Sequence, residues 1–209
     1  MSPHTATGTR EIQRLRTRRA LLDAALSQLE ERSLGSLGLR EVARAAGVSP
    51  TAFYRHFRDM DELGTALVEE ALTSLHVTVR GMLAATGDAE RRGAAAVRLV
   101  AALVRSRPAH VRFLVRERHG GVPVVREAIA AQLDAFADEI GVALCADPDS
   151  AGWDADDVRM LSRLLVDHMF MTASAFLAAS LRGEDWSAAT ATARAQLRLI
   201  HLGRVHWRG

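Results

Sequence analysis

Cysteine, lysine, tyrosine and long apolar runs are scarce or missing in this chain of 209 residues. The single cysteine, Cys145, excludes an intramolecular disulfide and any metal site built from several cysteines. No run of about 18 apolar residues occurs, so no transmembrane helix and no membrane partner are expected. The opening stretch, MSPHTATGTREIQRLRTRR, has no apolar core of the kind found in secretory signals. We therefore expect a cytoplasmic protein.

Signals for β-structure and for catalysis are missing as well. The sequence shows no hairpin signature, no alternating β-branched run and no repeat at a solenoid period. It also holds no phosphate-binding glycine loop, no nucleophile elbow and no paired zinc ligands. Asp167 and His168 are consecutive, and consecutive residues on a helix do not face each other. We expect an all-α protein that is not an enzyme and that binds neither a metal nor a cofactor.

What the chain does have is helical periodicity along almost its whole length. Apolar residues at three- and four-residue steps predict a first helix over residues 10–32, preceded by a disordered arm at 1–9. Two short helices follow within residues 38–59, and longer ones are expected over 60–85, 88–106, 108–117, 122–144, 154–181 and 186–207. About nine helices thus form two domains, residues 10–58 and 59–209.

The most informative segment is residues 38–59, GLREVARAAGVSPTAFYRHFRD, which predicts two short helices joined by a tight turn. Gly47 can end the first helix, because glycine enters a left-handed turn without a side-chain penalty. Ser49 is a good N-cap for the second helix, and Pro50 suits its first position. The two phenylalanines of this helix share one face, which leaves polar and aromatic residues pointing outward. Such a helix suits a DNA major groove; the alternative is a helical hairpin inside a larger domain.

Positive charge is concentrated in the same part of the chain. Residues 1–60 hold ten arginines and six acidic residues, a net charge of +4. The remaining residues hold 17 arginines and 19 acidic residues, a net charge of −2. Positive charge beside the predicted helix-turn-helix would favour the binding of a polyanion such as DNA. The basic cluster of the first helix, which includes Arg14 and Arg18, is a second candidate DNA contact, with an ordinary solvated helix face as the alternative.

The basic first helix and the stretch LREVARAAGVSPTAFYRHFRDMDELGTALVEE resemble the DNA-binding domain of the TetR family of bacterial regulators. The resemblance covers about residues 12–70. Three stretches, SLGSLGLREV, PTAFYRHFRDMDELG and FLVRERHGG, also resemble the FabR and DesT type of repressor, which controls unsaturated-fatty-acid synthesis. The resemblance implies an N-terminal domain that binds a double-stranded DNA operator. It also implies that the remaining helices form a ligand-binding and dimerisation domain.

The resemblance further implies which residues contact DNA: Arg40, Ser49, Pro50, Thr51, Ala52, Tyr54, Arg55 and His56. Their chemistry supports this role, because Tyr54 and His56 can hydrogen-bond phosphates and Thr51 offers a hydroxyl and a methyl group to base edges. Arg55 has an alternative as one half of a solvated ion pair with Asp59.

A single helix-turn-helix reads few base pairs, so we expect a homodimer on a pseudo-palindromic operator. Apolar residues at three- and four-residue steps on the last two helices can supply the four-helix interface: Leu161, Leu164, Leu165 and His168, with Leu197, Ile200 and His201. The alternative is that these faces complete the core of the subunit itself.

The second domain also offers residues for a hydrophobic effector. An elongated apolar cavity could be lined by Leu103, Phe113, Phe136, Met169 and Phe170, which could equally be ordinary core. A cluster of arginines that includes Arg105, Arg112 and Arg116 could bind phosphates at its mouth. The alternative is a solvated basic helix paired with Glu117 and its neighbours. An apolar cavity with a basic mouth would suit a long-chain acyl-CoA effector, which is also the ligand class that the resemblance implies.

We therefore expect a ligand-responsive repressor of fatty-acid desaturation or lipid metabolism genes. Two other functions stay open. One is a regulator of efflux or other catabolic genes that responds to a different hydrophobic small molecule. The other is a DNA-binding protein whose second domain only dimerises. Nothing in the sequence fixes whether a ligand tightens or releases DNA binding.

Overall fold

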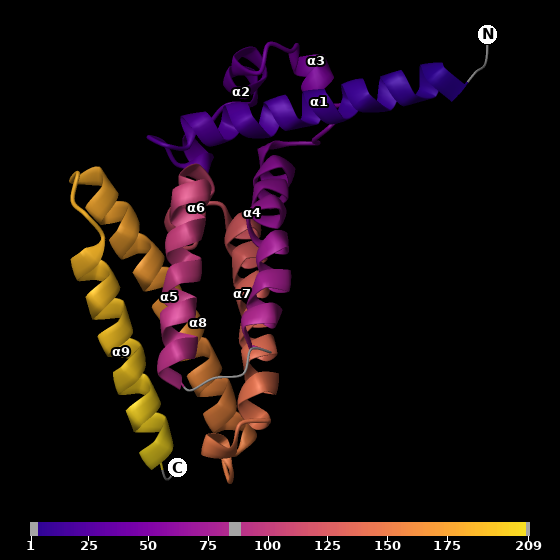
Figure 1. Ribbon diagram of the computed structural model, residues 1–209. Coiled ribbons are helices and arrows are strands. Elements are labelled where there is room, and N and C mark those ends of the chain that lie inside the picture. The colour runs from indigo at the N-terminus through magenta and orange to yellow at the C-terminus, as the bar shows by residue number, and fades with distance from the viewer. Residues whose placement is uncertain (1–3, 84–88, 208–209) are drawn as a thin grey trace.

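The computed structural model describes residues 4–83 and 89–207, and helices make up most of both ranges (Figure 1). The elements are α1 (His4–Gln28), the 3-10 turn η1 (Leu34–Ser36), α2 (Leu39–Ala45), α3 (Pro50–Phe53), α4 (Met60–Leu83), α5 (Ala89–Ser106), α6 (Pro108–Glu117), α7 (Pro123–Cys145), the 3-10 turn η2 (Pro148–Ser150), α8 (Ala155–Leu181) and α9 (Ser187–His206). No strand occurs in the described ranges, and the all-α prediction is confirmed. The predicted ends of the long helices from α5 onward agree with the structure to within two residues.

The first helix differs from the prediction at both ends. We expected a disordered arm over residues 1–9, but α1 is already helical at His4, so residues 4–9 extend the helix. Residues 1–3 of the predicted arm lie outside the described residues. Once a helix has a nucleus, each added residue extends it at little cost, and residues 4–9 contain no proline to stop it. The helix also ends at Gln28, four residues before the predicted end.

The turn of the helix-turn-helix is built as its residues predict. Gly47 has a φ of +70°, in the left-handed region. The amide of Val48 donates to the carbonyl of Ala43 at 2.9 Å and closes the end of α2. The hydroxyl of Ser49 accepts from the amide of Ala52 at 3.1 Å and caps α3. This turn places α2 and α3 on the side of α1 that faces away from the helical body (Figure 1).

The two domains share one continuous apolar core. Buried residues of α1 and α3, such as Leu21 and Phe53, belong to the same cluster as Leu67 of α4, Phe113 of α6 and Ile129 of α7. A second, smaller cluster joins α5, α6, α8 and α9. The segment that carries α1, α2 and α3 therefore rests on α4 and α6 through core packing.

Helix α8 is the one described helix that is long and apolar enough to cross a membrane, by length and composition alone. A single helix of this kind is weak evidence for a membrane span. The helix packs against α5, α7 and α9 within the bundle. The core helix of a globular protein meets the same criterion, because burial against other helices also selects apolar residues.

Gly64 marks the tightest contact between the domains and yields a first prediction. A Cβ at this position would lie 2.4 Å from Cδ2 of Leu34 and 2.7 Å from Cγ2 of Val125. Overpacking costs about 1–3 kcal/mol, whereas alanine gains about 1 kcal/mol over glycine inside a helix. We expect Gly64→Ala to lower the free energy of unfolding by about 1 kcal/mol in urea denaturation, because the clash exceeds the helix gain.

The matched control is Gly93→Ala in α5, where the added Cβ would meet Leu197 at an ordinary 3.5 Å. This control is expected to be neutral or stabilising. A Gly64→Ala protein as stable as the Gly93→Ala protein would contradict the close approach at this junction.

Candidate DNA interface and effector cavity

Most of the residues predicted to contact DNA lie on or beside α2 and α3, where they form part of the protein surface. Six of them are exposed: Arg40, Ser49, Pro50, Thr51, Tyr54 and Arg55. Ala52 and His56 are half-buried beside them. The ring of Tyr54 meets the buried Phe53 edge-on, and the tyrosine side chain is still 61% exposed. Tyr54 is therefore held at its base and free at its hydroxyl.

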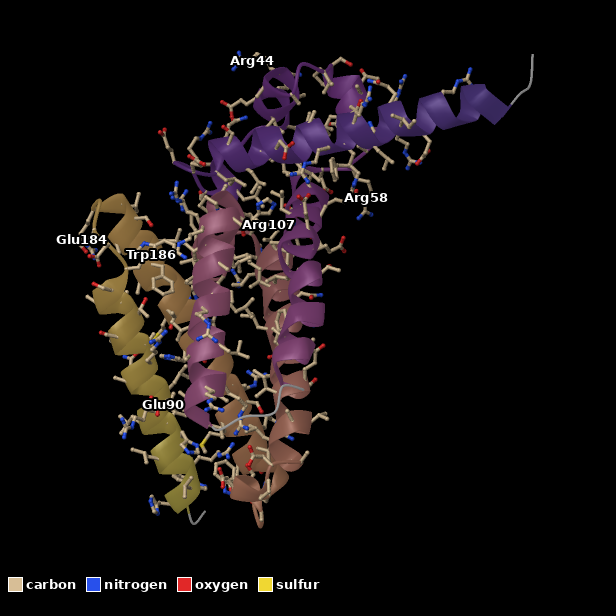
Figure 2. The ribbon with its side chains drawn as sticks, in the orientation of Figure 1. Arg44, Arg58, Glu90, Arg107, Glu184 and Trp186 are labelled. Atoms are coloured by element: carbon tan, nitrogen blue, oxygen red, sulfur yellow. The ribbon has the colours of Figure 1, made fainter. Side chains whose placement is uncertain are left out.

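Arg44 extends this surface and was missed by the sequence prediction. Its side chain is exposed and lies on the outer side of α2 (Figure 2). It stands four residues after Arg40, and residues four apart share a helix face. That spacing is the signal that could have found it.

The ion-pair alternative for Arg55 is not what the structure shows. Within the described residues no ion pair joins Arg55 to Asp59, whose carboxylate instead accepts from the amide of Glu62 at 2.8 Å. Glu62 in turn accepts from the amide of Arg58 at 2.7 Å. These bonds cap the start of α4, and Arg55 is exposed.

The pKa of His56 is affected by burial and by the positive charges near this surface. Burial lowers the pKa of its imidazole, and the nearby charges of Arg14, Arg18 and Arg55 lower the pKa further. His56 is therefore neutral at pH 7, and it would meet DNA as a neutral hydrogen-bonding group. The three guanidinium groups around it create the positive field that phosphates require.

The two arginines predicted from α1 have different surroundings. Arg14 is exposed, with Glu11 at 3.9 Å. Arg18 points into the domain, where its guanidinium lies 4.5 Å from the centre of the Phe57 ring and donates to the carbonyl of His56 at 3.4 Å. The prediction of Arg18 as an open DNA contact is corrected, because the guanidinium holds the end of the helix-turn-helix against α1.

The arginines of α6 hold the junction between the domains instead of forming a basic mouth. Arg116 donates to the carbonyls of Leu29, Arg32 and Glu30 at 3.1, 2.5 and 3.3 Å. These carbonyls follow the end of α1 and lack helical partners, so a guanidinium fork satisfies them well. Arg112 lies 3.8 Å from the carboxylate of Glu30. The predicted ligand contacts Arg112 and Arg116 are therefore corrected to contacts between α6 and the segment after α1.

Glu70 of α4 forms the second contact of this junction. Its carboxylate lies 2.7 Å from the guanidinium of Arg19 on α1 and 3.3 Å from Nε2 of His110 on α6. Arg107, which lies below α1 where α5 passes into α6 (Figure 2), donates to the carbonyl of Glu70 at 3.3 Å. One carboxylate thus joins α1, α4 and α6.

Glu117 forms the third contact and is 1% exposed. Its Oε1 accepts from the amide of Leu34 at 3.0 Å, in the loop that leads into α2. The sequence offered Glu117 as a partner for the arginines of its own helix. The structure directs it to the DNA-binding domain, so α6 holds that domain at both of the last two positions of the helix.

An apolar cavity of about 130 Å³ lies inside the helical body. Sixteen side chains line it, all of them apolar, from α4, α5, α6, α7 and α8. Leu103, Phe136, Met169 and Phe170 are among them, as the sequence suggested. Phe113 is not, because this side chain is 1% exposed and packs in the core shared with the DNA-binding domain.

Arg105 also departs from its predicted place at a ligand mouth. Its guanidinium lies 4.7 Å from the centre of the Trp186 ring, at the turn between α8 and α9. A guanidinium over an indole face is a favourable contact that fixes this turn. The arginines expected to form a basic cavity mouth on α5 and α6 therefore do not form one, because each of them contacts a partner away from the cavity.

Of the two predicted dimer helices, α9 lies at the edge of the molecule, whereas α8 crosses diagonally behind α5 from the lower centre to the upper left (Figure 1). Leu161 and His168 are 5% and 3% exposed, so these two predictions are corrected to core of the subunit itself. Leu165, Leu197, Ile200 and His201 are half-buried, and Leu164 is 46% exposed. The apolar side chains that reach solvent on these helices also include Met160, Met171, Leu199, Leu202 and Val205.

His168 yields a prediction for acid stability. Its Nε2 lies 3.2 Å from the carbonyl of Ala193, and burial lowers the pKa of the imidazole below its ordinary 6.5. Below pH 6.5 the unfolded chain therefore takes up a proton that the folded protein resists, and stability falls as the pH falls. We expect the Tm of the natural protein to fall further between pH 8 and pH 5 than the Tm of the His168→Gln variant. The control is His206→Gln, at an exposed position, which should keep the natural pH profile.

Two short helices joined by a tight turn, with exposed arginines on and beside them, are thus attached to a helical body through a shared core. Residues 21–67 match the family model described as bacterial regulatory proteins, tetR family. The family model thus matches the two short helices, the turn between them and parts of the helices on either side, and the remaining helices lie outside the match.

Solved structures of similar fold extend over both domains. FadR from Bacillus subtilis in complex with stearoyl-CoA has a TM-score of 0.70 and 16% identity, over 88% of this chain and 98% of that one. Reduced NemR from E. coli has a TM-score of 0.64 and 19% identity, over 88% and 96%. The complex of SmeT with triclosan has a TM-score of 0.68 and 18% identity, over 88% and 90%. At these identities the likeness concerns the fold alone.

Proposed function

We propose that this protein is a repressor that acts in the cytoplasm, binds a pseudo-palindromic operator as a homodimer and responds to a long-chain acyl-CoA. The genes proposed are those of fatty-acid desaturation or lipid metabolism. The observation that carries the ligand class is the cavity wall, since all sixteen lining side chains are apolar. Such a wall favours a hydrocarbon chain over any polar metabolite, because an unpaired polar group there would be costly. The stearoyl-CoA bound by the FadR of similar fold supports the same class.

The size of the cavity suggests how a ligand would act. Ligand pockets usually measure about 300–1,000 Å³, and this cavity measures about 130 Å³. A long acyl chain must therefore push its walls apart. Those walls include Leu72 of α4 and Leu114 of α6, the helices that carry Glu70 and Arg116. Widening the cavity would shift the contacts that hold α1, and with them the spacing of two reading helices in a dimer.

The second candidate function is a regulator of efflux or other catabolic genes that responds to a different hydrophobic molecule. The same apolar wall favours it, since such a wall does not by itself select an acyl chain. The likeness to SmeT in complex with triclosan supports this alternative. A ligand panel decides between the two candidates.

The test combines footprinting with ligand titration of the purified full chain. We expect protection of two half-sites about 34–36 Å apart upstream of the regulated gene, and a change in operator affinity on addition of palmitoyl-CoA. Thermal-shift titration should show stabilisation by acyl-CoAs of increasing chain length and none by coenzyme A alone. Stabilisation by triclosan alone would favour the second candidate. If no ligand changed the Tm or the operator affinity, the protein would be a DNA-binding protein whose second domain only dimerises.

A further inference from the structure

A second hollow, here called the polar cleft, lies beside the apolar cavity. It measures about 160 Å³ and is formed by the end of α6, the first half of α7 and the middle of α8. Its charged and titratable side chains are Arg118, His119, Arg126, Asp134, Arg163 and Asp167. The sequence singled out no role for Arg126 or Arg163, which lie on different helices and meet only in the fold.

The polar cleft and the apolar cavity share part of their walls. Leu133 and Val166 line both. Arg118 lies at the boundary, because its guanidinium is 5.0 Å from the centre of the Phe170 ring, a side chain of the cavity wall, and pairs with Asp167 of the cleft. A ligand that entered at the cleft would therefore place its next atoms against Leu133, Val166 and Phe170.

The cleft carries a net positive charge, and its arginines form ion pairs that an incoming anion could replace. Three arginines face two aspartates, which leaves one net positive charge among these five side chains. Arg163 lies 2.6 Å from Asp134, and both side chains are more than half exposed. Arg126 donates to the carbonyl of Gly120 at 2.8 Å. Exposed pairs of this kind are worth about 0–1 kcal/mol, so an anionic ligand can replace the aspartates as the partner of the arginines.

We propose that the polar cleft binds the anionic head of the effector while its hydrocarbon chain enters the apolar cavity past Phe170. The shared chemistry is a carboxylate or phosphate at the end of an alkyl chain, from a free fatty acid or from an acyl-coenzyme A. The inference rests on the proposed function, which places the hydrocarbon chain of the ligand in the apolar cavity, and adds the polar cleft as the site for the anionic head. Arginine suits either anion, because its planar fork donates two parallel hydrogen bonds.

The position of the cleft also connects the head of the ligand to the DNA-binding domain. Arg118 directly follows Glu117, which holds the amide of Leu34, and Arg126 is bonded to the turn after α6 through Gly120. An anion that draws Arg118 and Arg126 together acts on the turn that ends α6. That turn is adjacent to the contact that fixes the loop before α2.

The test compares three dodecyl ligands by calorimetry on the full chain: laurate, lauroyl-CoA and the uncharged dodecanol. The variant is Arg126→Gln with Arg163→Gln, and the control is Arg159→Gln, an arginine of α8 paired with Asp156 outside the cleft. We expect the double variant to weaken laurate and lauroyl-CoA about tenfold and to leave dodecanol unchanged. The control should bind all three as the natural protein does. Asp134→Asn should tighten the anionic ligands, because it removes a competing carboxylate.

The outcomes separate this inference from the proposed function. Loss for both anions assigns the cleft to either anionic head, the carboxylate of laurate or the phosphates of lauroyl-CoA, whereas loss for lauroyl-CoA alone assigns it to the phosphates; each supports the proposal. Equal weakening of dodecanol, or unchanged binding of both anions, overturns the cleft while the apolar cavity stands. A natural protein that binds no dodecyl ligand overturns both.

Discussion

Replacing Tyr54 with alanine is expected to weaken operator binding about 100-fold, because a homodimer loses the same contact at both half-sites. The tyrosine side chain is 61% exposed and its ring touches Phe53 only edge-on, so its hydroxyl is free to meet a phosphate. A hydrogen bond to a charged group is worth about 1.5 kcal/mol. Two such losses amount to about 3 kcal/mol, or roughly a 100-fold change in Kd. The measurement is a gel-shift or anisotropy titration on the operator located by footprinting.

Tyr54→Phe serves as the partial control, since it removes the hydroxyl and keeps the ring. It should lose nearly as much affinity as alanine if the hydroxyl makes the contact. Val142→Ala, at a position 75% exposed on α7, tests for non-specific loss and should bind DNA normally. An alanine variant at Tyr54 that folds and binds the operator like the natural protein would remove α3 and the turn after it from the DNA interface.

Filling the apolar cavity is expected to abolish the response to acyl ligands. Ala173 of α8 lines the cavity and is 7% exposed, so a phenylalanine at this position would take up the space that the acyl chain needs. We expect Ala173→Phe to weaken binding of palmitoyl-CoA at least about 100-fold, as steric exclusion costs more than the lost apolar contact alone. The operator affinity of this variant should no longer change when palmitoyl-CoA is added.

The matched control for this prediction is Ala131→Phe, an exposed position on α7. It adds the same side chain outside the cavity and should leave ligand binding unchanged. Thermal unfolding of both variants establishes that they fold. If Ala173→Phe bound palmitoyl-CoA as tightly as the control, the effector would have to bind outside the apolar cavity, and the proposed coupling through α4 and α6 would be wrong.

The helices and the DNA-binding surface followed from local signals. Helices α6 and α7 begin at Pro108 and Pro123, where proline suits the first position. Gly47 and Ser49 define the turn between α2 and α3 through their own backbone preference and side-chain oxygen. The clear boundary errors were the two ends of α1, which begins before residue 10, where no local signal marks a start, and ends four residues early. Exposure of Tyr54 followed from the helical spacing that buries its neighbouring phenylalanines.

The arginines show where such reasoning stops. The sequence grouped Arg105, Arg112 and Arg116 because they are close along the chain, but a guanidinium takes whichever partner the fold brings to it. For Arg116 those partners are carbonyls more than 80 residues earlier in the chain. Conversely, Arg126 and Arg163 are remote in sequence and share a cleft.

The sequence by itself determined that this chain is helical throughout most of its length and that it contains a helix-turn-helix. These features depend on spacing, caps and turn residues within a few positions of one another. Only the tertiary structure decided which side chains line the cavity, which arginines hold the junction between the domains and which surface of α8 and α9 stays exposed. Those outcomes depend on packing between helices that are distant in sequence, where shape and partner availability outweigh local preference.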